Sequence, residues 1–134
     1  MLAQADAELG AYATIQAMLD AWNQRDPDAL ALLFQSDGDL VAADGQRLEG
    51  RQAVRTYYEK SLSGPYGSLE LRDVTLHAVR TIEEGIFLVD ATWNVYAPDS
   101  SEPAASPSAT LLLSYKEGEW HIVASRIMIP TRID

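Results

Sequence analysis

Acid–base chemistry in this sequence could come from a tyrosine pair, two carboxylates within apolar runs, and two isolated histidines. Tyr57 and Tyr58 lie in a helical pattern, whereas Asp39 and Asp90 lie in patterns typical of strands. A tyrosine can donate a hydrogen bond to a developing oxyanion, and a carboxylate or an imidazole can remove a proton. If the protein is an enzyme, we expect Tyr58 as the donor or acid, with Asp39, Asp90 or a histidine as the base. Tyr58 and Asp90 are therefore the candidate catalytic residues.

Arg126 is a charged residue within an otherwise apolar strand pattern near the end of the chain. An arginine in such a place is either paired with a carboxylate or in contact with a ligand. The pair would be with Asp90 or Glu70, and the ligand would carry an acidic or carbonyl group. Asp90, Thr92 and Asn94 alternate with apolar residues, so their strand has one polar face. That face is either a polar patch in a pocket or interface, or a hydrogen-bonded structural surface.

Composition narrows the classes of partner. The chain has 134 residues, with 20 acidic and 10 basic side chains and a net charge of −10, which argues against binding nucleic acids or anionic membranes. It has no cysteine, and His77 and His121 are isolated, so we expect no metal site and no cofactor. No Walker, GxGxxG, HExxH or GxSxG motif occurs. With no apolar run of transmembrane length and no signal-peptide pattern, we expect a cytoplasmic protein.

The first half of the chain has the spacing of helices. A helix is predicted over 3–25, and Asp26-Pro27 ends it and caps a second helix that runs to about 36–38. A short strand over 39–43 and a turn at Asp44-Gly45 precede a third helix from Gly50 to Leu62. The apolar stripe of the first helix comprises Tyr12, Ile15, Leu19 and Trp22, with Met18 beside it.

The second half alternates in the manner of strands, predicted over 69–81, 86–96, 110–116 and 120–129. The alternation slips near Arg72-Asp73, which indicates a bulge that curves the sheet. Residues 97–109 are rich in Pro, Ser and Ala and are predicted to form a mobile hairpin loop, either a featureless loop or a lid. Helices followed by hairpin-connected strands predict an α+β fold in a single domain over 1–134: a cone-shaped roll of three helices on a curved antiparallel sheet.

Several short motifs in this order resemble the NTF2-like superfamily, and within it the SgcJ/EcaC group of the DUF4440 and SnoaL-like families. The likeness extends from about residue 8 to residue 130. It rests on Ala21-Trp22-Asn23, Asp26 to Leu30, Gly50 to Val54, Leu88 to Trp93, Gly118 to Ile122 and Ser125 to Pro130. The resemblance implies a cone with a pocket between helices and sheet, also described as cystatin-like, and a homodimer formed through the outer sheet face. One such fold carries many functions.

The best-known chemistries of these families lack key residues here. Ketosteroid isomerases need a carboxylate base where this chain has Ala42 and a tyrosine where it has Met18, although Tyr58 matches a pocket tyrosine. SnoaL-type cyclases place a catalytic aspartate in the last long strand, which has no acid in this chain. Scytalone-dehydratase-like chemistry needs a His–Asp pair that nothing in the spacing brings together.

We therefore predict a cofactor-free pocket for a small hydrophobic or aromatic molecule, in keeping with an accessory or enzymatic role in polyketide-like secondary metabolism. The predicted ligand-binding residues are Met18, Trp22, Tyr57, Tyr58, Trp93 and Arg126. The alternative is a non-catalytic dimerisation or oligomerisation module. A cavity lined by Tyr58, Trp22 and Arg126 would favour binding, whereas an interior filled by Met18, Trp22 and Phe34 would favour the module.

Overall fold

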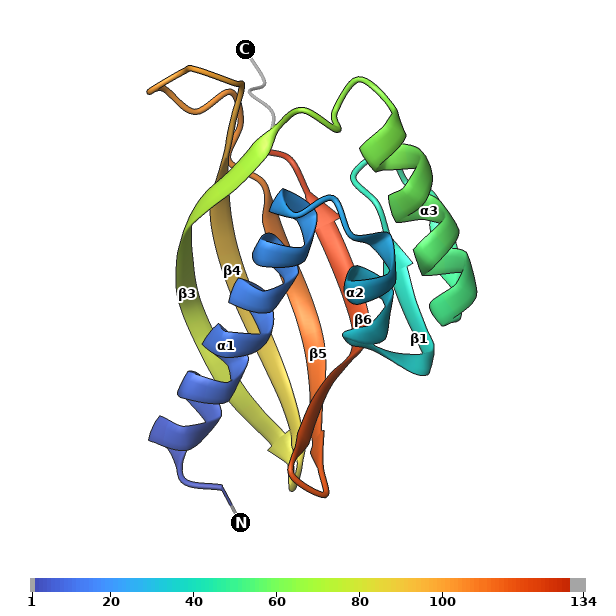
Figure 1. Cartoon of the computed structure of the whole chain (residues 1–134). Coiled ribbons are helices and arrows are strands. Elements are labelled where there is room, and N and C mark those ends of the chain that lie inside the picture. Colours follow the sequence, from blue (N-terminus) through green and yellow to red (C-terminus); the bar gives the residue numbers. More distant parts are fainter. Residues whose placement is uncertain (1, 131–134) are drawn as a thin grey trace.

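Three helices cover one face of a curved six-stranded sheet in the computed structural model, which describes residues 2–130 (Figure 1). The helices are α1 (Gln4–Asn23), α2 (Pro27–Leu32) and α3 (Arg51–Ser63). The strands are β1 (Phe34–Val41), β2 (Arg47–Glu49), β3 (Glu70–Glu83), β4 (Ile86–Tyr96), β5 (Ser108–Lys116) and β6 (Glu119–Met128). Their order across the sheet is β2-β1-β6-β5-β4-β3. The predicted α+β architecture is confirmed.

The sheet is mixed, not wholly antiparallel as predicted. β1 runs parallel to β6, and the other four strand pairs are antiparallel. The chain leaves the β1–β2 hairpin through α3 and enters the opposite edge of the sheet as β3. The three antiparallel connections β3–β4, β4–β5 and β5–β6 then bring β6 back beside β1 in the same direction, so residues as distant in sequence as Val41 and Arg126 pair.

The region between α2 and α3 departs most from the sequence prediction. Phe34, expected in a helix, begins β1, where it pairs with Ile122, while the Ile122 amide donates to the Leu33 carbonyl at 2.7 Å. The short strand β2 was not predicted. It pairs with β1 across the Asp44-Gly45 turn and leads into α3 through Gly50, whose φ of 90° favours glycine.

Two local predictions are confirmed. The Asp26 carboxylate caps α2 by accepting a hydrogen bond from the Ala29 amide at 3.0 Å. The register of β3 against β4 shifts between Arg72 and Thr75, and Asp73 has a φ of 63° at this bulge.

The core lies between the helices and the sheet. Tyr12 does not belong to it, since it is 45% exposed; the buried stripe of α1 is rotated away from that residue and includes small side chains. Gly10 provides the closest approach on α1, because a Cβ there would lie 2.2 Å from Cε2 of Trp120. The largest fully buried side chains are Ile15, Leu19, Leu30, Phe34, Leu40, Leu111, Leu113 and Ile122.

The loop between β4 and β5 is attached to the sheet over its second half. The backbone of Ala104 and Ala105 bonds to Val95, and the Trp93 amide donates to the Pro107 carbonyl at 3.2 Å. The unattached part is therefore shorter than the predicted range of 97–109, and its mobility stays a prediction.

Side chains of α1 bond to the backbone of the edge strand β3 and of the residue before it. The Asn23 side chain both donates to the Leu71 carbonyl and accepts from the Leu71 amide, each at 2.9 Å. The Trp22 indole donates to the Leu69 carbonyl, and the Gln4 amide donates to the Val79 carbonyl, again at 2.9 Å. These bonds fix α1 along the edge of the sheet.

Candidate functional site

The aromatic residues predicted to line a pocket pack in the core on the helix side of the sheet. Met18, Tyr58 and Trp93 are each only 5% exposed and belong to one hydrophobic cluster, against which Trp22 packs. The rings of Trp22 and Tyr58 meet edge to face with centroids 6.3 Å apart. Tyr57 also packs on this cluster, its ring meeting that of Tyr58 edge to face with centroids 5.4 Å apart, so the structure brings five of the six predicted ligand-binding residues together.

Tyr58 is the one ionisable residue within this buried cluster. Burial raises the pKa of its phenol above the ordinary value, so the group stays protonated. Its hydroxyl bonds to no other described residue, and no fully buried side-chain oxygen in that part of the chain lacks a partner. The hydroxyl is thus not committed to another described residue and remains able to donate a hydrogen bond.

Asp90 and Arg126 lie on the other face of the sheet. Along β4, Asp90 alternates with the buried Val89 and Ala91, so its side chain projects away from the helices. Its carboxylate accepts a hydrogen bond from the Thr110 hydroxyl at 2.7 Å. The predicted catalytic pair Tyr58 and Asp90 is therefore separated by the thickness of the sheet.

The ion pair predicted for Arg126 exists, but its partner is neither Asp90 nor Glu70. Nη1 of Arg126 donates to Oδ1 of Asp39 at 2.7 Å. Parallel pairing of β1 with β6 places Asp39 opposite Ala124, two residues before Val41, which is opposite Arg126; Glu70 instead pairs with Arg72. With this carboxylate in place, Arg126 does not require a ligand to balance its charge.

The polar side chains on the outer face of β4 form hydrogen bonds with neighbouring side chains. Thr92 bonds to Nε2 of His77 at 2.7 Å, and Asn94 bonds to Asp73 at 3.2 Å and to Ser106 at 2.7 Å. These contacts favour the structural interpretation of that face. Within residues 2–130, no cluster of three or more potential ligands could hold a metal ion.

The side of the core where a general base would stand is apolar. Ala42 is 3% exposed and Met18 is similarly buried. The buried polar residues described in the chain, apart from the tyrosines, are Thr14, Ser114 and Ser125, none of which is an acid or an imidazole. The helix side of the sheet can therefore donate hydrogen bonds but offers no evident group to abstract a proton.

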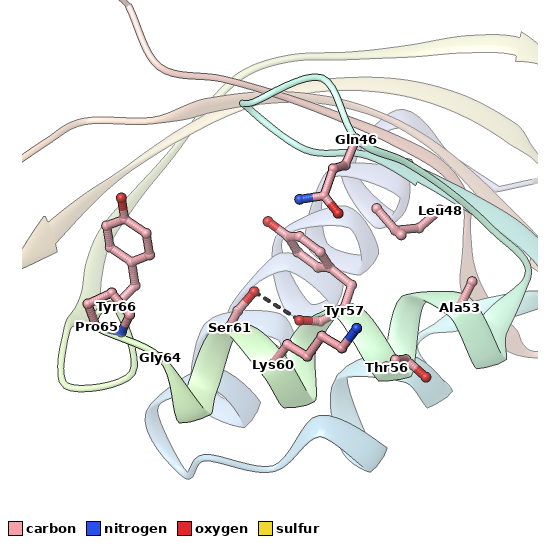
Figure 2. A pocket seen from close by; sticks show the side chains of 10 residues that line it. All are labelled: Gln46, Leu48, Ala53, Thr56, Tyr57, Lys60, Ser61, Gly64, Pro65 and Tyr66. Carbon is pink, nitrogen blue, oxygen red and sulfur yellow. Dashed lines mark hydrogen bonds between the residues drawn. The ribbon is translucent and has the colours of Figure 1, made fainter.

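A cavity of about 420 Å³ lies beside α3, between this helix and the β1–β2 turn (Figure 2). We call it the α3 groove. Its apolar surface comes from β2 and from both ends of α3, and its aromatic walls are Tyr57 and Tyr66, which stand apart on either side of the opening in Figure 2. The lining residues are Gln46, Leu48, Ala53, Thr56, Tyr57, Lys60, Ser61, Gly64, Pro65 and Tyr66.

Several polar groups of the groove are held in place. The Gln46 amide nitrogen donates to Oδ2 of Asp44 at 2.8 Å, and the Gln46 backbone amide donates to Oδ1 at 3.1 Å. The Ser61 hydroxyl donates to the Tyr57 carbonyl at 2.9 Å (Figure 2). Burial raises the pKa of the Tyr57 phenol, which therefore stays protonated. These bonds leave the Gln46 carboxamide oxygen as an acceptor at the groove.

Of the predicted site residues, Tyr57 lines the groove, while Met18, Trp22, Tyr58, Trp93 and Arg126 do not. Sequence reasoning missed Gln46, Lys60 and Tyr66. The signal for Lys60 was its position three residues after Tyr57 on one helix, which places both on neighbouring parts of the surface. The signal for Gln46 was the Asp44-Gly45 turn, since a turn of this kind often closes a hairpin.

A second cavity, of about 410 Å³, lies at the opposite end of the sheet. Leu2, Gly85, Phe87 and Tyr115 line it together with two carboxylates, Glu84 and Glu117. It contains none of the predicted site residues. Within the part of the chain that the structure describes, no helix is both long enough and apolar enough to cross a membrane.

Comparison with known protein families assigns the chain to one of them. The sequence matches the SnoaL-like domain over residues 15–120. No curated protein matches it. The structure is similar to a domain of unknown function with a cystatin-like fold from Nostoc punctiforme, with a TM-score of 0.86 and 19% identity, covering 98% of this chain and 82% of that one.

Two further solved structures are similar. One is an uncharacterised protein with a cystatin-like fold from Caulobacter vibrioides, with a TM-score of 0.77 and 27% identity, covering 94% of this chain and 91% of that one. The other is a ketosteroid isomerase-like protein from Erwinia carotovora atroseptica, with a TM-score of 0.72 and 16% identity, covering 92% and 96%. At these identities the likeness to the Nostoc and Erwinia proteins shows the fold alone.

Proposed function

Because the chain belongs to the SnoaL-like domain family, we propose that it is a small-molecule-binding member whose site is the α3 groove. The observation that carries this proposal is a cavity of about 420 Å³ with two tyrosine walls and an apolar base. Small-molecule sites are typically concave, of about 300–1,000 Å³, and apolar with a few placed polar groups. The ligand is a small, largely hydrophobic or aromatic molecule.

Binding, and not catalysis, is the activity that the arrangement supports. The groove lining includes the protonated Tyr57 as a donor but no carboxylate or imidazole. In the core beside Tyr58, the position of a general base is occupied by Ala42. A donor without a base can orient a carbonyl or hydroxyl group and cannot by itself complete a proton transfer. The protein therefore acts as a carrier or accessory protein.

The proposal includes an accessory role in polyketide-like metabolism and placement within the SgcJ/EcaC group. Two features support these finer assignments. The motifs from Gly50 to Val54 and from Leu88 to Trp93 resemble that group. Aromatic or partly unsaturated molecules also suit the groove, because Tyr57 and Tyr66 can pack against planar rings.

A neutral aromatic probe tests the proposed function. We expect 2-naphthamide to bind the wild type and to raise its melting temperature in a concentration-dependent way. Tyr57→Ala is expected to weaken binding about tenfold through loss of an aromatic wall. Tyr12→Ala, which removes an exposed tyrosine far from the groove lining, is the matched control. If Tyr57→Ala binds 2-naphthamide with unaltered affinity, the α3 groove is not the binding site.

A second candidate function is dimerisation through the outer face of the sheet. Leu88, Leu112 and Ala124 lie opposite one another across β4, β5 and β6 and form a half-exposed apolar row on this face. The filled interior, in which Met18 and Phe34 are buried, also favours a structural module. Sedimentation of the wild type and of Leu112→Glu tests this function: a dimer that the variant converts to a monomer supports it, and a wild-type monomer contradicts it.

A further inference from the structure

We propose that the ligand of the α3 groove is an aromatic acid whose carboxylate is bound by Lys60, with its ring between Tyr57 and Tyr66. This inference rests on the proposed function, because it names the class of molecule that the same groove would bind.

The charge of the groove differs from that of the whole protein. The chain has 20 acidic and 10 basic residues, yet the groove lining contains one basic residue, Lys60, and no acidic residue. The lining of the groove therefore offers an anion one positive charge and no negative charge, in contrast to the protein as a whole.

Lys60 is not committed to a carboxylate of the protein. The nearest acid in sequence, Glu59, pairs with Arg55, which also binds Asp28. Among the described residues no ion pair involves Lys60. Asp44 precedes the lining residue Gln46 by two positions, and both oxygens of its carboxylate accept hydrogen bonds from Gln46. The ammonium group is thus available to an external anion.

The other basic residues of α3 are committed elsewhere. The Arg51 guanidinium donates two hydrogen bonds to the Phe34 carbonyl, at 3.0 and 2.6 Å, and so joins α3 to β1. Arg55 holds Asp28, as described above. Two of the three cations on this helix therefore serve the fold, while the third lies in the cavity wall.

The arrangement in Figure 2 gives the bound molecule an orientation. The Lys60 side chain runs along α3 below the Tyr57 ring, with its ammonium end toward Thr56. Tyr66 stands across the opening, and Gln46 lies above the Tyr57 ring. The Lys60 side chain is exposed, so its ammonium group can turn toward the opening, where a bound carboxylate leaves the aromatic ring of the ligand between the two tyrosines. The Gln46 carboxamide oxygen can then accept a hydrogen bond from a hydroxyl group on the ligand. A hydroxylated aromatic acid satisfies all three contacts.

Calorimetric titration with matched probes tests the inference. We expect 2-naphthoate to bind the wild type about three- to fivefold more tightly than 2-naphthamide, since an ion pair at an exposed site contributes no more than this. Lys60→Met keeps the length of the side chain and removes its charge, so this variant should bind both compounds equally. Lys116→Met is the matched control, because Lys116 is the other lysine of the chain and lies in the β5–β6 hairpin. It should keep the preference for naphthoate.

The outcomes separate this inference from the proposed function. If the wild type binds both compounds equally and Tyr57→Ala loses binding, the anion preference is wrong but the α3 groove remains the binding site. A preference for naphthoate that survives in Lys60→Met would also overturn it, by placing the cation elsewhere. Binding of neither compound would overturn both. Far-ultraviolet circular dichroism of each variant confirms that the fold is retained.

Discussion

Arg126 and Asp39 join the two parallel strands of the sheet through an ion pair of 2.7 Å on the face away from the helices. Their side chains are 40% and 33% exposed, so solvent and salt screen the attraction. The pair therefore contributes modestly to stability.

Replacing Arg126 by Met is expected to lower the free energy of unfolding by at most about 1 kcal/mol. Ligand affinity should not change, because Arg126 does not line the α3 groove. Urea unfolding measures the first quantity and titration with 2-naphthoate the second. A loss of affinity larger than about threefold would show that Arg126 belongs to the site.

Two substitutions of Tyr58 should separate the stability contributed by packing of its ring from that contributed by hydrogen bonding of its hydroxyl. Tyr58→Ala removes a buried ring and is expected to lower the free energy of unfolding by about 3–5 kcal/mol. Tyr58→Phe removes a hydroxyl that bonds to no other described residue, so its cost should stay below about 1 kcal/mol. Urea unfolding of both variants checks this. A large loss in Tyr58→Phe would reveal a hydrogen bond that the hydroxyl makes in solution.

The buried phenol also predicts a loss of stability at alkaline pH. Burial raises the pKa of Tyr58 in the folded protein above its ordinary value of 10.0, which the unfolded chain keeps. Above that value the unfolded state releases the proton first, so the free energy of unfolding falls by up to about 1.4 kcal/mol per pH unit. At pH values below the ordinary pKa, both states keep the proton and the full stability is present.

Unfolding measured at about pH 8 and about pH 11 tests this expectation. Tyr58→Phe should lose less stability than the wild type between the two conditions. Tyr12→Phe, which alters an exposed tyrosine, should behave like the wild type. Tyr57 and Tyr96 also have a raised pKa and remain in both variants, so their contributions cancel. Identical slopes for Tyr58→Phe and the wild type would contradict the burial effect.

Gly10 should be intolerant of even a methyl group. Alanine favours a helix over glycine by about 1 kcal/mol, but its Cβ would lie 2.2 Å from the Trp120 ring. That ring also packs on Phe87 and Tyr115, with centroids 5.2 and 5.1 Å away, and cannot move freely. Overpacking of this kind costs about 1–3 kcal/mol, so we expect a net loss in Gly10→Ala.

Thermal unfolding of Gly10→Ala measures that net effect. Gly64→Ala provides a control at a helix end, where the nearest contact of the added Cβ is 3.3 Å. Trp120→Leu in the Gly10→Ala background should recover part of the stability, because the smaller side chain leaves room. A melting temperature above that of the wild type in Gly10→Ala would show that helix propensity outweighs the contact.

Local signals in the sequence were sufficient to predict most of the fold. The three helices follow from apolar spacing and from breakers such as Pro27, and β4 was predicted over the range that the structure shows. The parallel pairing of β1 with β6 could not be predicted, because it joins residues such as Leu40 and Ser125 that no local pattern connects. β2 was missed because it has only three residues.

The site was predicted less well than the fold for a related reason. Tyr57 was recognised from its helix, but Gln46 and Tyr66 join it through the packing of a turn and a loop against α3. Apolar alternation correctly placed Trp93 in the interior but could not distinguish a cavity wall from a filled core. Arg126 was expected beside Asp90 because the position of β1 next to β6 was not foreseen.

The hydrogen bonds from α1 to β3 also affect whether a strand of another molecule can pair with the edge of the sheet. An edge strand normally presents free amides and carbonyls to which another chain can add. Here the Asn23 side chain occupies both backbone groups of Leu71, and Trp22 and Gln4 occupy the carbonyls of Leu69 and Val79. An approaching strand would have to displace α1 to pair at these positions. The helix thus protects these positions of the edge strand from templated aggregation, and it does so through side-chain contacts alone.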